Sequence, residues 1–147
     1  ILLWRIMNKL DYAGDLTPVQ SWELLSKEKN CYLVDCRTSA EWQFVGIPDL
    51  ETLEKKTLLI EWQIYPSMSL NDKFLEDIKQ SGIQKQDKLI FICRSGGRSR
   101  SAAEFLVSQG YENSFNCIHG FEGNHNPDGH RGKNSGWKFS KLPWKQG

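Results

Sequence analysis

An apolar segment that ends at a cysteine constrains the fold of this chain more than any other stretch. After Lys88, the residues Leu89–Ile92 are aliphatic or aromatic without a polar break, as in a strand that is covered on both faces. Cys93 follows at once, and then a turn of arginine, serine and glycine. A helical pattern begins at Arg100. The sequence therefore predicts a buried strand that delivers a thiol to a glycine-rich turn opening a helix.

The turn after Cys93 has the composition of an anion-binding site. Gly96 and Gly97 allow backbone angles that other residues avoid, so consecutive N–H groups can point to one centre. The following helix adds unpaired N–H groups and the positive end of its dipole. Such surroundings, with Arg94 and Arg98 nearby, lower the pKa of a thiol, and the thiolate is the nucleophile. A core cysteine beside an ordinary turn is the alternative, but it leaves two arginines and two glycines unexplained.

The segment Cys93–Ser99 (CRSGGRS) resembles the active-site loop of the rhodanese-like sulfurtransferases. In that family a cysteine and an arginine bracket a six-residue loop whose amides cradle a persulfide, and Cys93 and Arg98 match those positions. The resemblance implies that Cys93 is the catalytic nucleophile. It implies no metal and no organic cofactor. It also implies a substrate-binding loop made of Arg94, Ser95, Gly96, Gly97, Arg98 and Ser99.

Helical and strand patterns alternate along the rest of the chain. Thr17–Gln20 and Thr38–Glu41 match capping boxes, and Ser101–Glu104 resembles a third. Strands are predicted over residues 31–36, 56–62 and 113–118, and a further helix after Asn71. The fold class is therefore α/β, a single rhodanese-like domain with a largely parallel central sheet and helices on both faces. We expect an N-terminal extension over residues 1–15 and the domain over 16–147, with the site beyond the carboxyl ends of the strands.

Asp35 and Arg37 end the predicted strand 31–36, and the short helix with Glu41 follows. This order resembles the region that precedes the active site in rhodanese-like domains. An Asp and an Arg at a strand end usually cap a turn and pair with neighbours such as Glu41. We therefore expect Asp35 and Arg37 to support the site structurally. Whether the intervening Cys36 resolves a persulfide as a disulfide stays open.

The resemblance implies a sulfurtransferase. It would move a sulfane sulfur from a small anionic donor such as thiosulfate, through a persulfide on Cys93, to a thiophilic acceptor, either a small thiol or a protein. Two other classes remain open. One is a phosphatase or arsenate reductase that uses the same thiolate in the same kind of cradle. The other is a rhodanese-like module that only binds a partner, although the presence of Cys93 argues against it.

Composition and charge argue against several kinds of partner and favour one compartment. A net charge of +1 argues against nucleic acid or an anionic membrane as the main partner. No apolar stretch approaches the length of a membrane span, and the apolar residues 1–6 are too short for a signal peptide. Four cysteines without a Cys-x-x-Cys pair predict free thiols in a reducing compartment, the cytoplasm. His125, Asp128 and His130 match no compact metal site.

Overall fold

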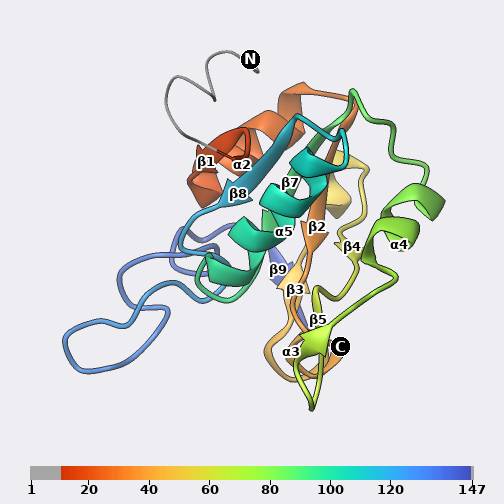
Figure 1. Cartoon of the computed structure of the whole chain (residues 1–147). Coiled ribbons are helices and arrows are strands. Elements are labelled where there is room, and N and C mark those ends of the chain that lie inside the picture. Colours follow the sequence, from red (N-terminus) through yellow and green to blue (C-terminus); the bar gives the residue numbers. More distant parts are fainter. Residues whose placement is uncertain (1–10, 147) are drawn as a thin grey trace.

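A five-stranded parallel sheet forms the centre of the molecule (Figure 1). The structure is a computed structural model, and it describes residues 11–146. The strand order is β1-β8-β7-β2-β4, and every pairing in this sheet is parallel. The strands are β1 (Gly14–Leu16), β2 (Cys31–Asp35), β4 (Leu58–Leu59), β7 (Lys88–Ile92) and β8 (Ser114–Cys117).

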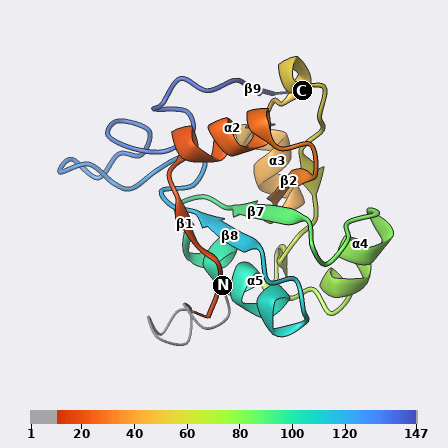
Figure 2. The ribbon, with the colours of Figure 1, turned by 90° about the horizontal axis from the view of Figure 1, so that it is seen from above.

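Helices cover both faces of this sheet. Figure 2 shows α2 on one side of the strands, and α4 and α5 on the other. This arrangement confirms the predicted α/β class. Within residues 11–146, no helix is both long and apolar enough to cross a bilayer. The helices are α2 (Pro18–Lys27), α3 (Ser39–Val45), α4 (Phe74–Gln80) and α5 (Gly97–Ser108), with a 3-10 turn η1 (Glu51–Leu53).

Two short antiparallel pairs lie outside the main sheet. One joins β3 to β9, and the other is a hairpin of β5 and β6. The hairpin and α3 lie together at the lower end of the molecule in Figure 1. The strands of these pairs are β3 (Ile47–Pro48), β9 (Trp144–Lys145), β5 (Gln63–Ile64) and β6 (Ser69–Leu70).

Strand β7 is apolar from Leu89 to Ile92 because both of its faces are buried there. Leu89 and Phe91 pack into the core beneath α4 and α5, whereas Ile90 and Ile92 pack into the core on the α2 side. Successive side chains of a strand point to opposite faces. Because β7 pairs with β2 on one side and β8 on the other, it lies inside the sheet and each of its two faces is covered by one core. The sequence-based prediction of a strand covered on both faces is confirmed.

Two helix starts were predicted correctly and one was wrong. Thr17 with Gln20 and Thr38 with Glu41 form capping boxes with both reciprocal hydrogen bonds. The helix after the Cys93 turn begins at Gly97, not at a capping box over Ser101–Glu104. Gly96, with φ of +116°, turns the chain directly into the helix, so no side-chain cap is needed.

Three other boundaries differ from the prediction. The segment 1–15 was expected to be an extension, but Tyr12 is buried and β1 begins at Gly14; residues 1–10 lie outside the described residues. The predicted strand 56–62 is reduced to β4, because the chain then turns so that Trp62 packs on Phe74 at 5.0 Å between ring centroids. Helix α4 begins at Phe74 instead of near Asn71, whose side chain accepts from the Lys73 N–H.

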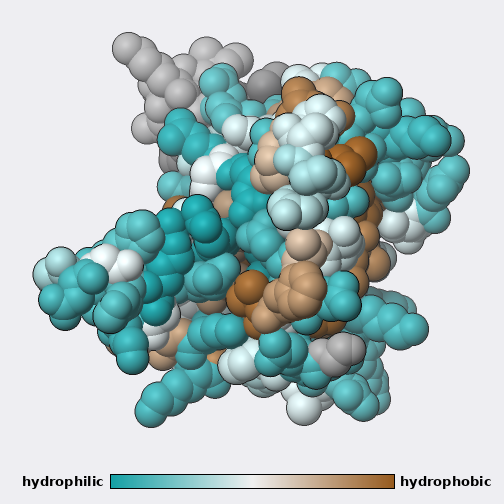
Figure 3. Space-filling model, turned by 90° about the horizontal axis from the view of Figure 1, so that it is seen from below, coloured by the Kyte–Doolittle hydropathy of each residue, from teal (hydrophilic) through white to brown (hydrophobic). Residues whose placement is uncertain are grey.

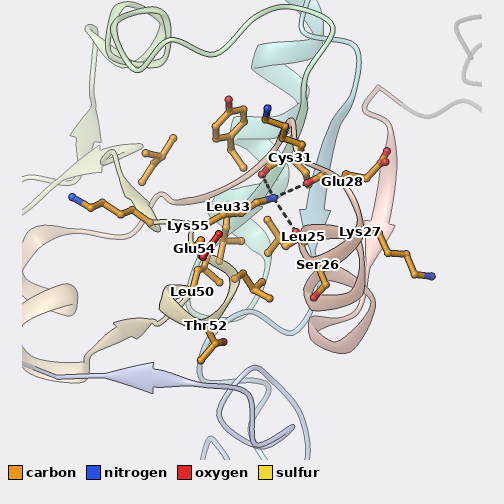
Figure 4. Close-up of a pocket in the computed structure, with 15 residues that line it drawn as sticks. Leu25, Ser26, Lys27, Glu28, Cys31, Leu33, Leu50, Thr52, Glu54 and Lys55 are labelled. Carbon is orange, nitrogen blue, oxygen red and sulfur yellow. Dashed lines mark hydrogen bonds between the residues drawn. The ribbon is translucent and has the colours of Figure 1, made fainter.

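Lys55 joins the end of α2 to the start of β2, at the amino ends of the strands, whereas Cys93 follows the carboxyl end of β7. Its ammonium donates to the carbonyls of Leu25, Glu28 and Cys31 at 2.8, 2.6 and 2.9 Å (Figure 4). The carbonyls of Leu25 and Glu28 lie at the end of α2, where helical partners run out, and Cys31 begins β2. The lysine lies beside an open cavity of about 910 Å³. It therefore acts as a cap supplied from a distant segment.

We predict that Lys55→Met lowers the free energy of unfolding by about 1–3 kcal/mol, because three partly buried carbonyls lose a charged donor. Lys56→Met is the matched control, since Lys56 is exposed and adjacent, and it should change stability by less than about 0.5 kcal/mol. Urea unfolding of both variants measures the difference. Equal losses in the two variants would show that the three carbonyls do not depend on Lys55.

The corner after β8, residues 120–122, packs against the backbone of the Cys93 turn. The carbonyl of Cys93 accepts from the Phe121 N–H at 2.8 Å, and that of Arg94 accepts from the Glu122 N–H at 3.0 Å. Gly120 approaches so closely that an added Cβ would lie 2.4 Å from the Cys93 oxygen, and its φ is +59°. Only glycine fits this position without moving the turn.

We predict that Gly120→Ala destabilises the protein by about 1–3 kcal/mol more than Gly129→Ala. Gly129 has a similar φ of +79° but no atom within 4 Å of an added Cβ, so it isolates backbone strain from the clash. Denaturant unfolding measures both variants. If the two substitutions destabilise equally, close packing behind the turn is not what requires glycine at position 120.

Candidate active site

The structure brings Cys93–Ser99 into one compact turn at the carboxyl end of β7. The Cys93 sulfur is buried, with the residue 1% exposed, and it accepts a hydrogen bond from the Gly96 N–H at 3.1 Å. The Ser99 hydroxyl lies 3.2 Å from the same sulfur. Because α5 begins at Gly97, the positive end of its dipole faces the sulfur region. The arrangement suits a sulfur anion.

Arg98 does not point freely into the turn but forms a forked ion pair with Glu41. Its two terminal nitrogens donate to the two carboxylate oxygens at 2.7 and 2.9 Å. Glu41 also accepts from the Thr38 N–H and hydroxyl, so the pair joins the start of α3 to the start of α5. Burial opposes ionisation of Glu41, but Arg98 outweighs it and lowers the pKa of Glu41 to about 2.

Asp35 and Arg37 pair with each other, whereas Glu41 was the partner expected from the sequence. Arg37 donates to both oxygens of Asp35, at 2.9 Å from Nε and 2.7 Å from Nη2, and to the carbonyl of Gly46 at 2.6 Å. Both side chains are fully buried, and the guanidinium lies 4.3 Å from the Phe121 ring centroid. No direct contact joins either side chain to Cys93 among the described residues, which fits a supporting position beneath the site.

A groove leads to the turn from the side of α3 and the β5–β6 hairpin. It encloses about 590 Å³ and its lining includes Arg94, Arg98, Phe44, Tyr65 and Met68. Figure 3 shows apolar side chains gathered near the middle of this lower face. Within the described part of the chain, the exposed Arg94 side chain has no hydrogen bond or ion pair. The groove therefore combines apolar walls with one unpaired cation.

The opposite side of the turn carries polar residues that sequence analysis did not identify. Ser99 donates to Asn116 on β8 at 2.6 Å, Asn116 donates to Asp15 at 3.2 Å, and Tyr12 donates to the same Asp15 oxygen at 2.8 Å. Asn116 sits in a predicted strand and Asp15 in the predicted extension. No motif or spacing marked either residue, because only the β1–β8 pairing brings them beside Cys93.

The remaining cysteines are buried free thiols. Cys36 is fully buried, and burial raises its pKa well above its usual range. Its S–H donates to the Ile92 carbonyl at 3.4 Å. Burial likewise raises the pKa of Cys31 to about 11 and that of Cys117 to about 12. These surroundings disfavour Cys36 as a resolving nucleophile. The residues that the structure describes contain no group of three or more potential metal ligands.

We predict that Glu41→Gln lowers the free energy of unfolding by about 1.5–3 kcal/mol near neutral pH, since the fork to Arg98 is lost. The folded pKa of about 2 lies below the unfolded value of about 4.3, so this stabilisation is present above pH ~4.3. It is lost as the pH falls toward 2. The difference between parent and variant should therefore shrink over that range.

Urea unfolding across this pH range tests the Glu41 prediction. Glu104→Gln is the control, because Glu104 pairs with the exposed Arg100 at the longer distance of 3.9 Å. Its effect should stay below about 1 kcal/mol at every pH. A Glu41→Gln difference that is constant down to pH ~2 would contradict the assignment of the pair as the cause.

Proteins of known sequence and structure are similar to this chain. The family model described as STR4 middle domain matches residues 14–147. A crystal structure of Rv0390 from M. tuberculosis is 42% identical, with a TM-score of 0.83, and the match covers 92% of this chain and 99% of that one. The thiosulfate sulfurtransferase GlpE of Haemophilus influenzae (strain PittEE) is 29% identical over 109 residues, which is 74% of this chain and 85% of GlpE.

A more distant structure agrees in fold. The crystal structure of a rhodanese-like domain protein from Staphylococcus aureus has a TM-score of 0.56 at 19% identity, and the match covers 90% of this chain and 99% of that one. The parallel sheet, the cysteine after its central strand and the family match over nearly the whole domain point to one conclusion. The chain belongs to the STR4 middle-domain family, and its fold is a rhodanese-like domain.

Proposed function

We propose that this protein is a sulfurtransferase in which Cys93 carries the sulfur. The Cys93 thiolate attacks the outer sulfur of a donor such as thiosulfate; a new S–S bond forms, and the bond to the sulfonate sulfur breaks with its electron pair leaving on sulfite. The product is a Cys93 persulfide anion. An acceptor thiolate then attacks the outer sulfur, and Cys93 leaves as the thiolate.

The observation that carries this proposal is the Gly96 N–H directed at the Cys93 sulfur, 3.1 Å away, in a turn that opens α5. A fixed N–H donor and a helix N-terminus stabilise negative charge on sulfur without reorganising during the reaction. The Arg94 side chain adds an exposed positive charge at the groove, suited to attracting an anionic donor. No metal or organic cofactor is needed for these steps.

The same observations disfavour the phosphatase alternative. A transferring phosphoryl group needs cationic donors that meet its oxygens, yet the Arg98 guanidinium is held by Glu41 in a fork. Only four residues separate Cys93 from Arg98, and in the related phosphatases the loop is one residue longer. A phosphate in the shorter ring would leave buried donors unpaired, each costing about 1–3 kcal/mol.

The acceptor is proposed to reach Cys93 along the groove beside Arg94. Phe44 and Tyr65 are 72% and 59% exposed on its walls, which is unusual for aromatic side chains without a partner. Inside the groove, Arg98 and Glu41 neutralise each other and leave Arg94 as the uncompensated charge. We therefore propose an acceptor thiol, free or on a protein, with apolar and anionic groups beside it.

We predict measurable transfer of sulfur from thiosulfate to cyanide, negligible hydrolysis of aryl phosphates, and loss of transfer in Cys93→Ser. Mass spectrometry after thiosulfate treatment should find one added sulfur, on Cys93. Cys117→Ser is the matched control and should retain most of the activity, since Cys117 lies in β8 with its thiol buried. Efficient phosphate hydrolysis without sulfur transfer, or near-parental transfer by Cys93→Ser, would overturn the proposed function.

A further inference from the structure

A chain of polar side chains runs from the Cys93 sulfur to β1 and plays no part in the reaction proposed above. It passes through Ser99, Asn116, Asp15 and Tyr12. Ser99 and Asn116 are buried, at 0% and 3% exposed. Buried polar groups of this kind are retained only when their hydrogen bonds are satisfied, so the direction of each bond can be worked out.

The direction of these hydrogen bonds follows from Asp15, toward the far end of the chain of polar side chains. An ionised Asp15 carboxylate can only accept, so the group of Asn116 that faces it must be the amide NH₂. Burial and the hydrogen bond to Asp15 raise the pKa of Tyr12 to about 12, which keeps Tyr12 protonated as a second donor to Asp15. The Asn116 oxygen is thereby turned toward Ser99.

The Ser99 hydroxyl has one hydrogen, and it donates this hydrogen in a hydrogen bond to the Asn116 oxygen at 2.6 Å. Ser99 therefore presents a lone pair to the Cys93 sulfur 3.2 Å away. A thiol satisfies that lone pair by donating its S–H, whereas a thiolate would face it without a hydrogen between them. For Ser99 to stabilise the thiolate, its hydroxyl must release Asn116 and rotate.

We propose that Asn116, oriented by Asp15, is a positioning residue that holds the Ser99 hydroxyl as an acceptor and so favours the thiol form of Cys93 in the resting protein. The proposal goes beyond sulfur transfer, because it concerns the protonation state of free Cys93 whatever substrate the thiolate takes. The resting thiol is thereby kept less reactive. Ser99 becomes a donor to sulfur only when the bond to Asn116 is given up.

Other charged or titratable groups also surround Cys93, and the test must separate their fields from the effect of Ser99. Arg98 and Arg100 belong to α5, and Arg98 is close enough to interact with Cys93 electrostatically. Cys36 packs in the same core as Cys93, Cys117 packs in the core on the other side of the sheet, and burial raises the pKa of both thiols. The groups around the turn are therefore Arg94, Arg98, Arg100, Glu41, Asp15, Tyr12, Cys36, Cys117 and His119.

The experiment measures the fraction of Cys93 thiolate against pH in the full chain, from the far-ultraviolet absorbance of the thiolate. The signal of each variant is corrected by subtracting that of the same variant carrying Cys93→Ala. In Asn116→Leu, which has similar size but no acceptor, Ser99 is free to donate to sulfur. We expect about tenfold more thiolate at a pH below the pKa. Asn113→Leu, just before the same strand, is the control and should leave the thiolate fraction unchanged.

Repeating the measurement in a Ser99→Ala background separates the effect of the Ser99 hydroxyl from the electrostatic effect of the surrounding charges. If Asn116 acts through Ser99, Asn116→Leu should change the thiolate fraction less than about twofold once Ser99 is alanine. Asp15→Ala, at an exposed position, removes the acceptor for the Asn116 amide and should raise the thiolate fraction more when Ser99 is present than in the Ser99→Ala background. It decides the matter alone if Asn116→Leu fails to fold.

Two results would overturn the proposal. One is an unchanged or smaller thiolate fraction in folded Asn116→Leu, or in Asp15→Ala if that variant must decide. The other is an increase of the same size in the Ser99→Ala background, which would reflect the electrostatic field alone. Neither result bears on whether Cys93 carries sulfur, because thiosulfate is absent from the measurement. A failed sulfur-transfer assay would likewise leave the thiolate measurement unaffected.

Discussion

Burial of strand β7 on both faces is the constraint from which the rest of the site follows. Its side chains alternate between two cores, and its backbone pairs with β2 on one side and β8 on the other. A strand held in this way cannot shift by one residue without exchanging its buried faces. Cys93, the next residue, therefore leaves the sheet at one defined point.

The charges around Cys93 are arranged so that few of them remain unpaired. Arg98 is neutralised by Glu41, and the buried Arg37 by Asp35. A buried arginine whose partner is missing is strongly destabilising, so these pairs are requirements of the fold as much as features of the site. The positive potential at the sulfur therefore comes from the backbone, namely the Gly96 N–H and the start of α5. The Arg94 side chain lies in the groove. This division suits a small sulfur anion better than a phosphate.

The corner after β8 links the two halves of the site. Gly120 and Phe121 pack against the carbonyl of Cys93, and the Phe121 ring lies beneath Arg37. One short segment thus contacts both the Cys93 turn and the buried ion pair of Arg37 and Asp35. On the other side of the turn, Asn116 belongs to the strand just before this corner. The protonation state of Cys93 is in this way coupled to strand pairing at the edge of the sheet.

The sequence by itself determined the central strand, the glycine turn, two capping boxes and the α/β class, because these depend on local pattern and on burial that alternates over a few residues. It also marked Cys93 and the loop through Ser99, since chemistry and turn residues adjoin there. Only the tertiary structure decided that Glu41 pairs with Arg98, that Asp35 pairs with Arg37, and that Asp15 and Asn116 reach the sulfur through Ser99. Glu41 and Arg98 are 57 residues apart, and Asp15 and Asn116 are 101 residues apart, so local spacing gives no signal for these contacts. Asp35 and Arg37 are only two residues apart, but Glu41 was an equally available partner in the sequence. The physical reason is that several competing carboxylates and arginines can satisfy any one charge, and packing of the sheet selects among them.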